Sequence, residues 1–382
     1  MDENTRRQKT WKLLCKAAGP WLRSKFAYTH DTMEPEGPFL VISNHVTNWD
    51  PLLLALSFPT RHIHFVASEH LFRLGKVSKL ISYLVAPIPR RKGANGAATA
   101  IDSMRKMRAG NAVCIFGEGE TTWDGVSSKV FPATGSLAKM SGATLITFRF
   151  EGGYLTMPRW GRGVRRGKMH GGIVNVYTPE QLKAMKPLEI EAAMNADIYE
   201  DAWARQKSNP VKFRGRNRAE GVEVAVFMCP KCGQVGTVRG KGNEVSCSCG
   251  MKCTVTEYGT FDPPVPFENM AQWNVWQHEK LLSGEFPHGE ELFSDESAEL
   301  VKISKDAQET AASGRLSMTQ DAIAVGEVRF SLAGITDMAL IQRKRLAFMH
   351  GEDYYEIRTP EPKCLRKYYA VWRNAAESGQ KK

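Results

Sequence analysis

A histidine and an aspartate stand close together where an apolar stretch of the chain ends. The segment 41–50 reads VISNHVTNWD, and four residues separate His45 from Asp50. When a carboxylate holds one imidazole nitrogen, the other nitrogen can accept a proton from a hydroxyl group. The same pair can also serve structure alone, with the aspartate capping the next helix and the histidine bonding to backbone. The pair by itself leaves both interpretations open.

A second carboxylate follows another short apolar run. The segment 111–122 reads NAVCIFGEGETT, so Glu118 lies between Gly117 and Gly119. Glycines let the backbone approach a ligand closely. No third glycine occurs at the spacing of a dinucleotide-binding fingerprint. We therefore expect a substrate-binding turn here and no nicotinamide or flavin dinucleotide.

Together these segments resemble the phospholipid/glycerol acyltransferase family, the relatives of 1-acylglycerol-3-phosphate acyltransferase. The family motif Asn-His-x4-Asp matches Asn44, His45 and Asp50 without gaps. Its Phe-Pro-Glu-Gly-Thr-Arg-Ser block corresponds to 116–122, FGEGETT. A strand-ending motif with an acceptor-binding arginine corresponds to VAPIPRRKG before it, and a fourth, apolar motif to ATLITF after it. Order and spacing agree over residues 40 to about 150.

The resemblance implies transfer of a fatty acyl group from an acyl thioester to a hydroxyl of a glycerolipid or lysophospholipid. The donor would be acyl-CoA or acyl carrier protein. His45 would act as general base and Asp50 would orient it, with no covalent acyl-enzyme. The substrate-binding residues implied are Asn44, Arg90, Arg91, Glu118 and Gly119, with either arginine as the candidate for the acceptor.

Three positions depart from the family motif. Gly117 replaces its proline, Glu120 its threonine and Thr121 its arginine. An arginine can make a bidentate, charge-assisted contact with phosphate, and threonine cannot. We therefore expect an acceptor that differs from the usual glycerol-phosphate one.

Five of the eight cysteines cluster in one short segment. Cys229 and Cys232 are separated by two residues, and Cys247 and Cys249, fourteen residues later, by one. Two close cysteine pairs brought together by a hairpin can hold zinc in a tetrahedral four-sulfur site. Cys253 is an alternative ligand to Cys247 or Cys249. Such a closed site leaves no open coordination position, so we predict structural zinc.

Length, composition and charge limit the class of protein. The chain has 382 residues, 42% of them hydrophobic, and a net charge of +11. This length favours two or three domains, and the charge favours an anionic partner. The longest apolar stretches run about ten residues, against the roughly 20 that span a bilayer. With no secretory signal, we expect reduced cysteines and a cytoplasmic protein.

The N-terminal segment 1–36 is basic and carries apolar residues at helical spacing. Trp11, Leu14, Cys15 and Ala18 follow that spacing until Gly19 and Pro20, where the pattern predicts a break. A basic amphipathic helix with tryptophan suits an anionic membrane surface, and it can equally pack on the main domain. From the first interpretation we expect a peripheral protein on the inner face of the membrane.

The remaining chain is expected to form an α/β domain, a zinc ribbon and a β-rich module. Residues 37–210 alternate strands at 39–43, 62–67, 112–116, 145–150 and 172–177 with helices at 51–58, 71–85, 94–109 and 135–141. Residues 211–260 form the ribbon and 261–300 a helical linker, with a helix near 269–282. Residues 301–382 resemble a pleckstrin-homology-like module, with strands at 315–318, 322–325, 328–332, 346–349 and 354–358 and a closing helix at 361–376.

Two other functions compete with acyl transfer. Zinc ribbons often bind nucleic acid, but no aromatic platform interleaves with the basic residues of this ribbon, so we do not expect a nucleic-acid partner. A lipid-binding adaptor with an inactive acyltransferase-like domain is the other alternative. A basic, glycine-rich stretch at 159–168 has two interpretations of its own, a phosphate-binding loop or a solvated hairpin.

Overall fold

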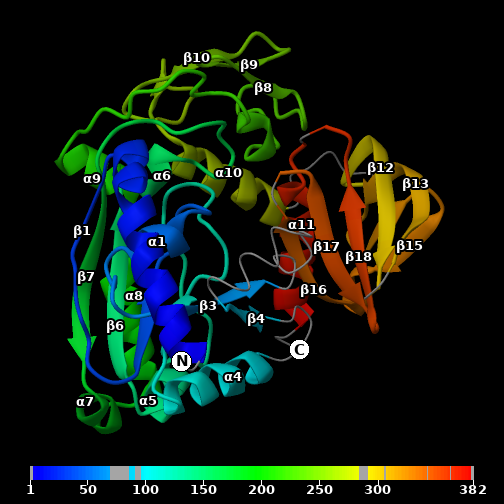
Figure 1. Ribbon diagram of the computed structural model, residues 1–382. Coiled ribbons are helices and arrows are strands. Elements are labelled where there is room, and N and C mark those ends of the chain that lie inside the picture. The colour runs from blue at the N-terminus through cyan, green and yellow to red at the C-terminus, as the bar shows by residue number, and fades with distance from the viewer. Residues whose placement is uncertain are drawn as a thin grey trace. The chain divides into compact units, whose positions relative to one another are not determined.

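The computed structural model describes residues 3–68, 86–90, 96–283, 291–304, 307–341, 343–361 and 363–379. The chain divides into two compact units (Figure 1). Unit 1 comprises Met1–Arg159 and Gly163–Gly215, and unit 2 comprises Trp160–Arg162 and Arg216–Lys382. None of the helices in the described ranges is long and apolar enough to cross a membrane.

Unit 1 is built on a seven-stranded, mostly parallel sheet with strand order β1-β7-β6-β2-β5-β3-β4. Every neighbouring pair in this sheet is parallel except β6 and β7, which are antiparallel. The strands are β1 (Tyr28–His30), β2 (Phe39–Ser43), β3 (Ile63–Ser68), β4 (Ile88–Arg90), β5 (Ala112–Phe116), β6 (Thr144–Glu151) and β7 (Met169–Tyr177). The predicted mixed α/β class is confirmed, and strands 39–43 and 112–116 have the predicted bounds.

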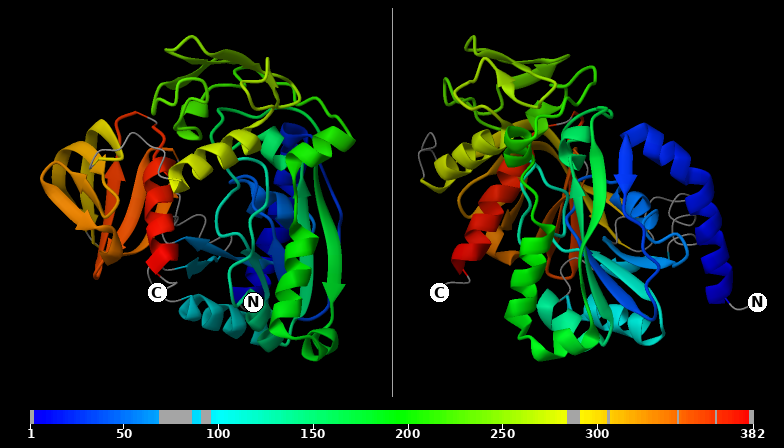
Figure 2. Two further views of the ribbon diagram at one scale, coloured as in Figure 1. Left: turned by 180° about the vertical axis from the view of Figure 1, so that it is seen from behind. Right: turned by 90° about the vertical axis from the view of Figure 1, so that its left-hand side faces the viewer.

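Helices cover both faces of this sheet because β2 is apolar on both sides. Phe39 and Val41 pack into the core under α1 (Glu3–Phe26) and α2 (Asp50–Ala55). Leu40 and Ile42 pack into the core on the other face. The helices there are α4 (Ala97–Arg108), α5 (Thr134–Ser141) and α8 (Pro187–Ile198), and Figure 2 shows α1 and α8 on opposite sides of the sheet. Burial on both faces is what a near-continuous apolar strand predicts.

Three short helices complete unit 1, one after β6 and two after β7 in the sequence. They are α6 (Gly153–Thr156), α7 (Pro179–Ala184) and α9 (Ala202–Ser208). The predicted helix at 71–85 lies outside the described residues.

The predicted break in the N-terminal helix was wrong. Helix α1 continues through Gly19 and Pro20 to Phe26. Trp11, buried to 1% exposure, donates from its indole nitrogen to the carbonyl of Phe58 at 3.1 Å. The core contacts of this face outweigh the single backbone hydrogen bond that a proline removes from a helix. The same packing means that Trp11 belongs to the core and is not presented at the surface.

The first part of unit 2 contains a small sheet, the β8–β11 sheet, with order β11-β10-β9-β8. Its strands are β8 (Val238–Lys241), β9 (Glu244–Cys247), β10 (Lys252–Val255) and β11 (Phe261–Asp262). A two-residue turn through Gly242 joins β8 to β9. Helix α10 (Met270–Leu282) follows where a helix was predicted, and Asn269 caps its N-terminus.

The C-terminal part of unit 2 is an antiparallel sheet with strand order β15-β14-β13-β12-β18-β17-β16. Its strands are β12 (Phe293–Ile303), β13 (Gln308–Met318), β14 (Ala322–Val325), β15 (Val328–Ser331), β16 (Ile335–Ile341), β17 (Arg345–His350) and β18 (Asp353–Arg358). Helix α11 (Arg366–Gly379) packs Tyr368 and Val371 into the same core. The predicted β-rich module with a closing helix is thus confirmed.

Two strands of this sheet were missed by the sequence analysis. Strand β12 begins within the segment predicted as a helical linker, and β16 had no predicted counterpart. Both strands contain register shifts, between Asp295 and Ala298 in β12 and between Ile335 and Asp337 in β16. A bulge breaks the two-residue alternation of buried and exposed side chains, so the pattern of a strand is lost.

Candidate active site and candidate metal centre

The loop between β2 and α2 brings His45 and Asp50 into direct contact. The Nδ1 atom of His45 lies 2.7 Å from Oδ2 of Asp50. The imidazole stacks on the ring of Phe116, at the end of neighbouring β5, with ring centroids 4.3 Å apart. Its side chain is 18% exposed, whereas that of Asp50 is fully buried. The imidazole is therefore fixed at Nδ1 and on one face, and part of it reaches the surface.

The Asp50 carboxylate is satisfied by its own loop. It accepts from the backbone nitrogens of Val46 at 2.7 Å and Thr47 at 3.0 Å, and from the Thr47 hydroxyl at 2.7 Å. The prediction that Asp50 is the N-cap was wrong: Trp49 occupies that position and Asp50 is the first helical residue. Its side chain turns back toward the loop because the unpaired loop donors and the His45 ring lie there. A carboxylate that accepts all these bonds leaves His45 Nδ1 as a donor and Nε2 as an acceptor.

Glu118 braces the same loop from the turn after β5. Its Oε1 accepts from the backbone nitrogen of His45 at 2.8 Å, and its Oε2 from that of Ser128 at 2.8 Å. Burial raises the pKa of Glu118 to about 7, while the hydrogen bonds from Ser128 and His45 oppose this shift. Glu118 thus holds His45 through the backbone. Ser128, its second partner, had no signal in the sequence.

Asn44 also acts on the backbone. Its side-chain nitrogen donates to the carbonyl of Phe150 at 2.9 Å, and its side-chain oxygen accepts from the nitrogen of the same residue at 2.7 Å. Asn44 is fully buried. These contacts tie the end of β2 to β6, and they favour a positioning role over the predicted substrate-binding role.

Gly119 and Arg90 lie next to each other beside this turn. Gly119 has a φ of +76°, and a Cβ atom there would lie 2.1 Å from the ring of Phe131 and 2.9 Å from a guanidinium nitrogen of Arg90. No side chain fits in that space, so the position requires glycine. The guanidinium of Arg90 stacks on Phe131 at 4.0 Å. Arg91, the alternative to Arg90, lies outside the described residues.

An arginine from a distant segment reaches the position where the family motif has its own. Arg159 donates to Oε2 of Glu120 at 2.6 Å and to the carbonyl of Thr121 at 3.0 Å. Its guanidinium stacks on the Trp123 ring at 4.1 Å. The sequence marked Arg159 only as part of a basic stretch, and no local signal paired it with Glu120.

The basic stretch at 159–168 is partly buried and partly exposed. Arg159 is 11% exposed and Arg165 is 5% exposed. The backbone of Arg166 pairs with that of Arg214 as a short bridge. Arg162, Arg166 and Lys168 are exposed, so the solvated interpretation fits these three residues, whereas Arg159 and Arg165 are held by the fold.

Residues 25–155 match the family model described as Acyltransferase. This segment is similar in sequence to acyltransferases. It contains both the His45–Asp50 loop and the Glu118 turn. Among solved structures, this chain is similar to the 1-acyl-sn-glycerophosphate (LPA) acyltransferase PlsC from Thermotoga maritima. The identity is 20% and the TM-score 0.42, over 52% of this chain and 81% of that chain.

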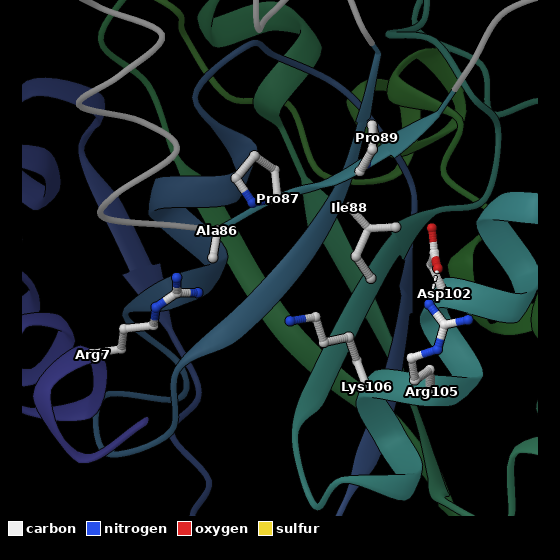
Figure 3. A pocket seen from close by; sticks show the side chains of 8 residues that line it. All are labelled: Arg7, Ala86, Pro87, Ile88, Pro89, Asp102, Arg105 and Lys106. Carbon is white, nitrogen blue, oxygen red and sulfur yellow. Dashed lines mark hydrogen bonds and ion pairs between the residues drawn. The ribbon is translucent and has the colours of Figure 1, made fainter. Parts of the chain in front are cut away.

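A cationic hollow also lies on unit 1, at β4 and α4 (Figure 3). Its volume is about 320 Å³. Figure 3 shows the Lys106 ammonium pointing into the hollow, while Arg105 is bonded to Asp102 at 2.8 Å. The hollow is lined by Arg7, Ala86, Pro87, Ile88, Pro89, Asp102, Arg105 and Lys106. Arg7, Arg105 and Lys106 thus place three positively charged side chains around one hollow.

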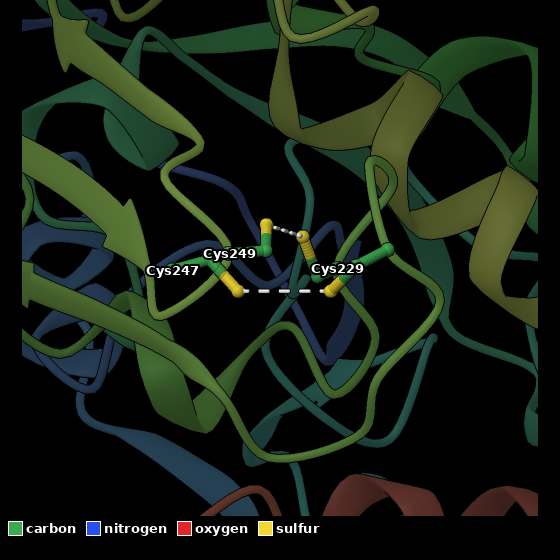
Figure 4. Close-up of side chains that lie close together, drawn as sticks. Cys229, Cys247 and Cys249 are labelled. Carbon is green, nitrogen blue, oxygen red and sulfur yellow. Dashed lines mark hydrogen bonds between the residues drawn. The ribbon is translucent and has the colours of Figure 1, made fainter.

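The four predicted cysteine ligands converge in unit 2, and Figure 4 labels Cys229, Cys247 and Cys249 among them. The sulfurs of Cys229, Cys232, Cys247 and Cys249 all lie within 4.8 Å of one another. Cys229 and Cys249 are 3.8 Å apart, and Cys232 and Cys247 are 3.9 Å apart. A tetrahedral zinc ion with bonds of about 2.3 Å separates its sulfur ligands by about 3.8 Å. The cluster therefore fits zinc in both donor type and size.

Cys253 lies outside this cluster. It belongs to β10, pairs in register with Val245 and is 3% exposed. Burial raises the pKa of the Cys253 thiol to about 12. These observations favour the four cysteines chosen from the sequence over a set that includes Cys253.

Proposed function

We propose that this protein transfers a fatty acyl group from an acyl thioester, acyl-CoA or acyl carrier protein, to a hydroxyl of a glycerolipid or lysophospholipid acceptor. His45 is the general base and Asp50 orients it. The family match over residues 25–155 supports acyl transfer as the class of reaction. The observation that carries the mechanism is the 2.7 Å contact between His45 Nδ1 and the buried Asp50 carboxylate.

The reaction follows from that contact in two steps. Nε2 of His45 takes the proton of the acceptor hydroxyl while its oxygen attacks the thioester carbonyl carbon. The tetrahedral intermediate collapses, the carbon–sulfur bond breaks, and the imidazolium returns the proton to the leaving thiolate. Asp50 stabilises the imidazolium that forms in between. No side chain is acylated, so the chain needs no nucleophile of its own.

The surroundings of His45 support this role. Glu118 accepts from its backbone nitrogen, Asn44 ties the residue before it to Phe150, and the Phe116 ring stacks on its side chain. A base kept in one orientation loses little entropy when the acceptor binds, which favours reaction. The local interpretation of the pair as a helix cap is weakened, because Asp50 makes no capping bond within α2.

The other parts of the chain support a peripheral enzyme with a structural metal. We propose that zinc bound by Cys229, Cys232, Cys247 and Cys249 stabilises the β8–β11 sheet. We propose that the outer side of α1 contacts anionic membrane, through exposed cations and the exposed Leu13 and Trp21. The C-terminal antiparallel sheet with its closing helix is consistent with a pleckstrin-homology-like module.

The experiment that tests acyl transfer supplies purified protein with labelled acyl-CoA and, separately, labelled acyl carrier protein. Acceptors are a panel of lysophospholipids and monoacylglycerols, and products are identified by mass spectrometry. We expect a labelled diacyl product with at least one acceptor, and none with the His45→Ala variant. Hydrolysis of the donor without any acylated lipid would contradict the proposal.

A further inference from the structure

We infer that Glu120 and Arg159 form a charge-neutral pair that selects an uncharged or zwitterionic acceptor over an anionic one. This inference rests on the proposed function, because it names the acceptor class of the same site. It concerns two side chains that the His45 mechanism does not use.

The pair is well defined. Arg159 donates to the Glu120 carboxylate at 2.6 Å and to the carbonyl of Thr121 at 3.0 Å. Its guanidinium lies over the Trp123 ring at 4.1 Å, and the Trp123 indole nitrogen lies 3.4 Å from the same Glu120 oxygen. Arg159 is 11% exposed and Glu120 36%. The guanidinium is thus fixed on three sides, and the carboxylate is the more exposed partner.

The same segment is attached to the candidate base. The backbone nitrogen of Thr122 donates to the carbonyl of His45 at 2.9 Å. Glu118, two residues before Glu120, accepts from the nitrogen of His45. An acceptor hydroxyl must come within hydrogen-bond distance of Nε2, so the remainder of the acceptor lies among the groups around this loop. The Glu120 side chain, on the same segment, is 36% exposed.

The ion pair determines whether an anionic group of the acceptor is attracted or repelled. A guanidinium without a counter-ion at this position would attract a phosphate, as arginines in phosphate sites do. Here the charge of Arg159 is already balanced by Glu120, and the carboxylate is the more exposed of the two groups. A phosphate monoester would therefore meet repulsion, whereas hydroxyl groups could donate to the carboxylate. The acceptor class that fits is a neutral or zwitterionic lipid alcohol.

The test compares lysophosphatidic acid with monoacylglycerol and lysophosphatidylcholine, using one acyl-CoA donor. The quantity measured is the ratio of kcat/KM for the anionic acceptor to kcat/KM for each of the others. For the wild-type protein we expect a ratio well below one. Glu120→Gln should raise the ratio roughly tenfold or more, because it leaves the charge of Arg159 uncompensated. Arg159→Gln should lower it, and the double variant should return it close to the wild-type value.

These variants separate specificity from structure. If the pair only supports the fold, all acceptors lose activity together and the ratio stays constant in both single variants, which would overturn the inference. A wild-type preference for lysophosphatidic acid would overturn it as well. Asp321→Asn, which unpairs the exposed Arg329 of β15, is the matched control and should leave the ratio unchanged.

The two single variants also guard against misfolding. If Glu120→Gln does not fold, Arg159→Gln still tests the inference, because the part-exposed Glu120 carboxylate can be solvated by water. Absence of transfer to every acceptor by the wild-type protein would count against the proposed function and not against the pair. Transfer with an unchanged ratio in Arg159→Gln would count against the pair alone.

Discussion

In the loop after β2, the buried Asp50 carboxylate is surrounded by donors from its own loop, whereas in the cysteine cluster four sulfurs face one another. The first arrangement is complete in the protein, because every strong acceptor has a hydrogen-bond donor. The second becomes complete when a cation binds, because thiolates repel one another and need a shared positive charge. One site is preorganised by hydrogen bonds, and under the proposed zinc binding the other depends on its metal.

The two sites also differ in how far apart in sequence their parts lie. His45 and Asp50 meet across one short loop. Glu118, in the turn after β5, bonds to the backbone of His45, and Asn44 ties the end of β2 to β6. The cysteines come as two close pairs that the β8–β9 hairpin joins. Removing a group should therefore affect chemistry at the first site and stability at the second.

The largest effect is expected at the metal centre. Protein purified without chelator should contain one zinc per chain, and Cys229→Ser should lose it and unfold unit 2 at lower temperature or denaturant concentration. Structural zinc sites contribute about 10 kcal/mol or more in small zinc-dependent domains. Elemental analysis and thermal unfolding with and without chelator measure this.

Cys253→Ser is the matched control for that prediction. It removes a buried thiol from the same sheet but should retain the metal. If Cys253→Ser loses zinc while Cys247→Ser keeps it, the ligand assignment is wrong. Purified protein that contains no metal, and whose unfolding temperature does not change with chelator, would contradict the structural zinc site.

At the His45–Asp50 loop the expected effect is on rate. His45→Ala should reduce acyl transfer by about 10² to 10⁴-fold, the range typical for loss of a general base. The fold should persist, because the ring is at the surface end of the site and the backbone bonds to Glu118 remain. His170→Ala, a part-exposed histidine on β7, is the control and should keep its activity. Near-normal turnover by well-folded His45→Ala protein would contradict the mechanism.

Glu118 should couple the loop to pH. Its pKa is raised to about 7 from 4.5, so the folded state binds more protons than the unfolded state between these values. Its contribution to stability is therefore fully present below about pH 4.5 and is lost as the pH rises through about 7. The loss is on the order of 3 kcal/mol across this window. Glu118→Gln should flatten that part of the stability profile, measured by denaturant unfolding from pH 4 to 8. A profile that matches the wild type would show that burial does not shift this group.

The smallest effect is expected on the outer side of α1. Reversing charge in the double variant Lys12→Glu/Lys16→Glu should weaken binding to anionic vesicles about tenfold or more, since each cation near such a surface contributes about 1 kcal/mol. Lys183→Glu on α7 is the matched control. Binding should also fall with added salt. Point variants are preferable to deleting the segment, because Trp11, Leu22 and Phe26 of α1 are in the core. Vesicle binding that is unaffected by the double variant would move the membrane surface elsewhere.

Sequence alone was sufficient wherever the relevant residues are neighbours along the chain. The strands 39–43 and 112–116 are short apolar runs with clear ends, and their bounds were predicted correctly. The His45–Asp50 contact needs only one tight loop, and the cysteine spacing needs only a hairpin. In each case the local chain fixes the distance between the groups.

Tertiary structure decided whatever depends on residues far apart. Arg159 reaches Thr121 across 38 residues, and Asn44 bonds to Phe150 across 106. The break predicted at Pro20 was overridden by the core packing of Trp11 and Phe26, and the bulged strands β12 and β16 lost their alternation. These outcomes are set by which surfaces meet when the chain folds. The local sequence gives each segment a preferred conformation. Contacts with residues far away in the sequence then decide which conformation the folded protein adopts.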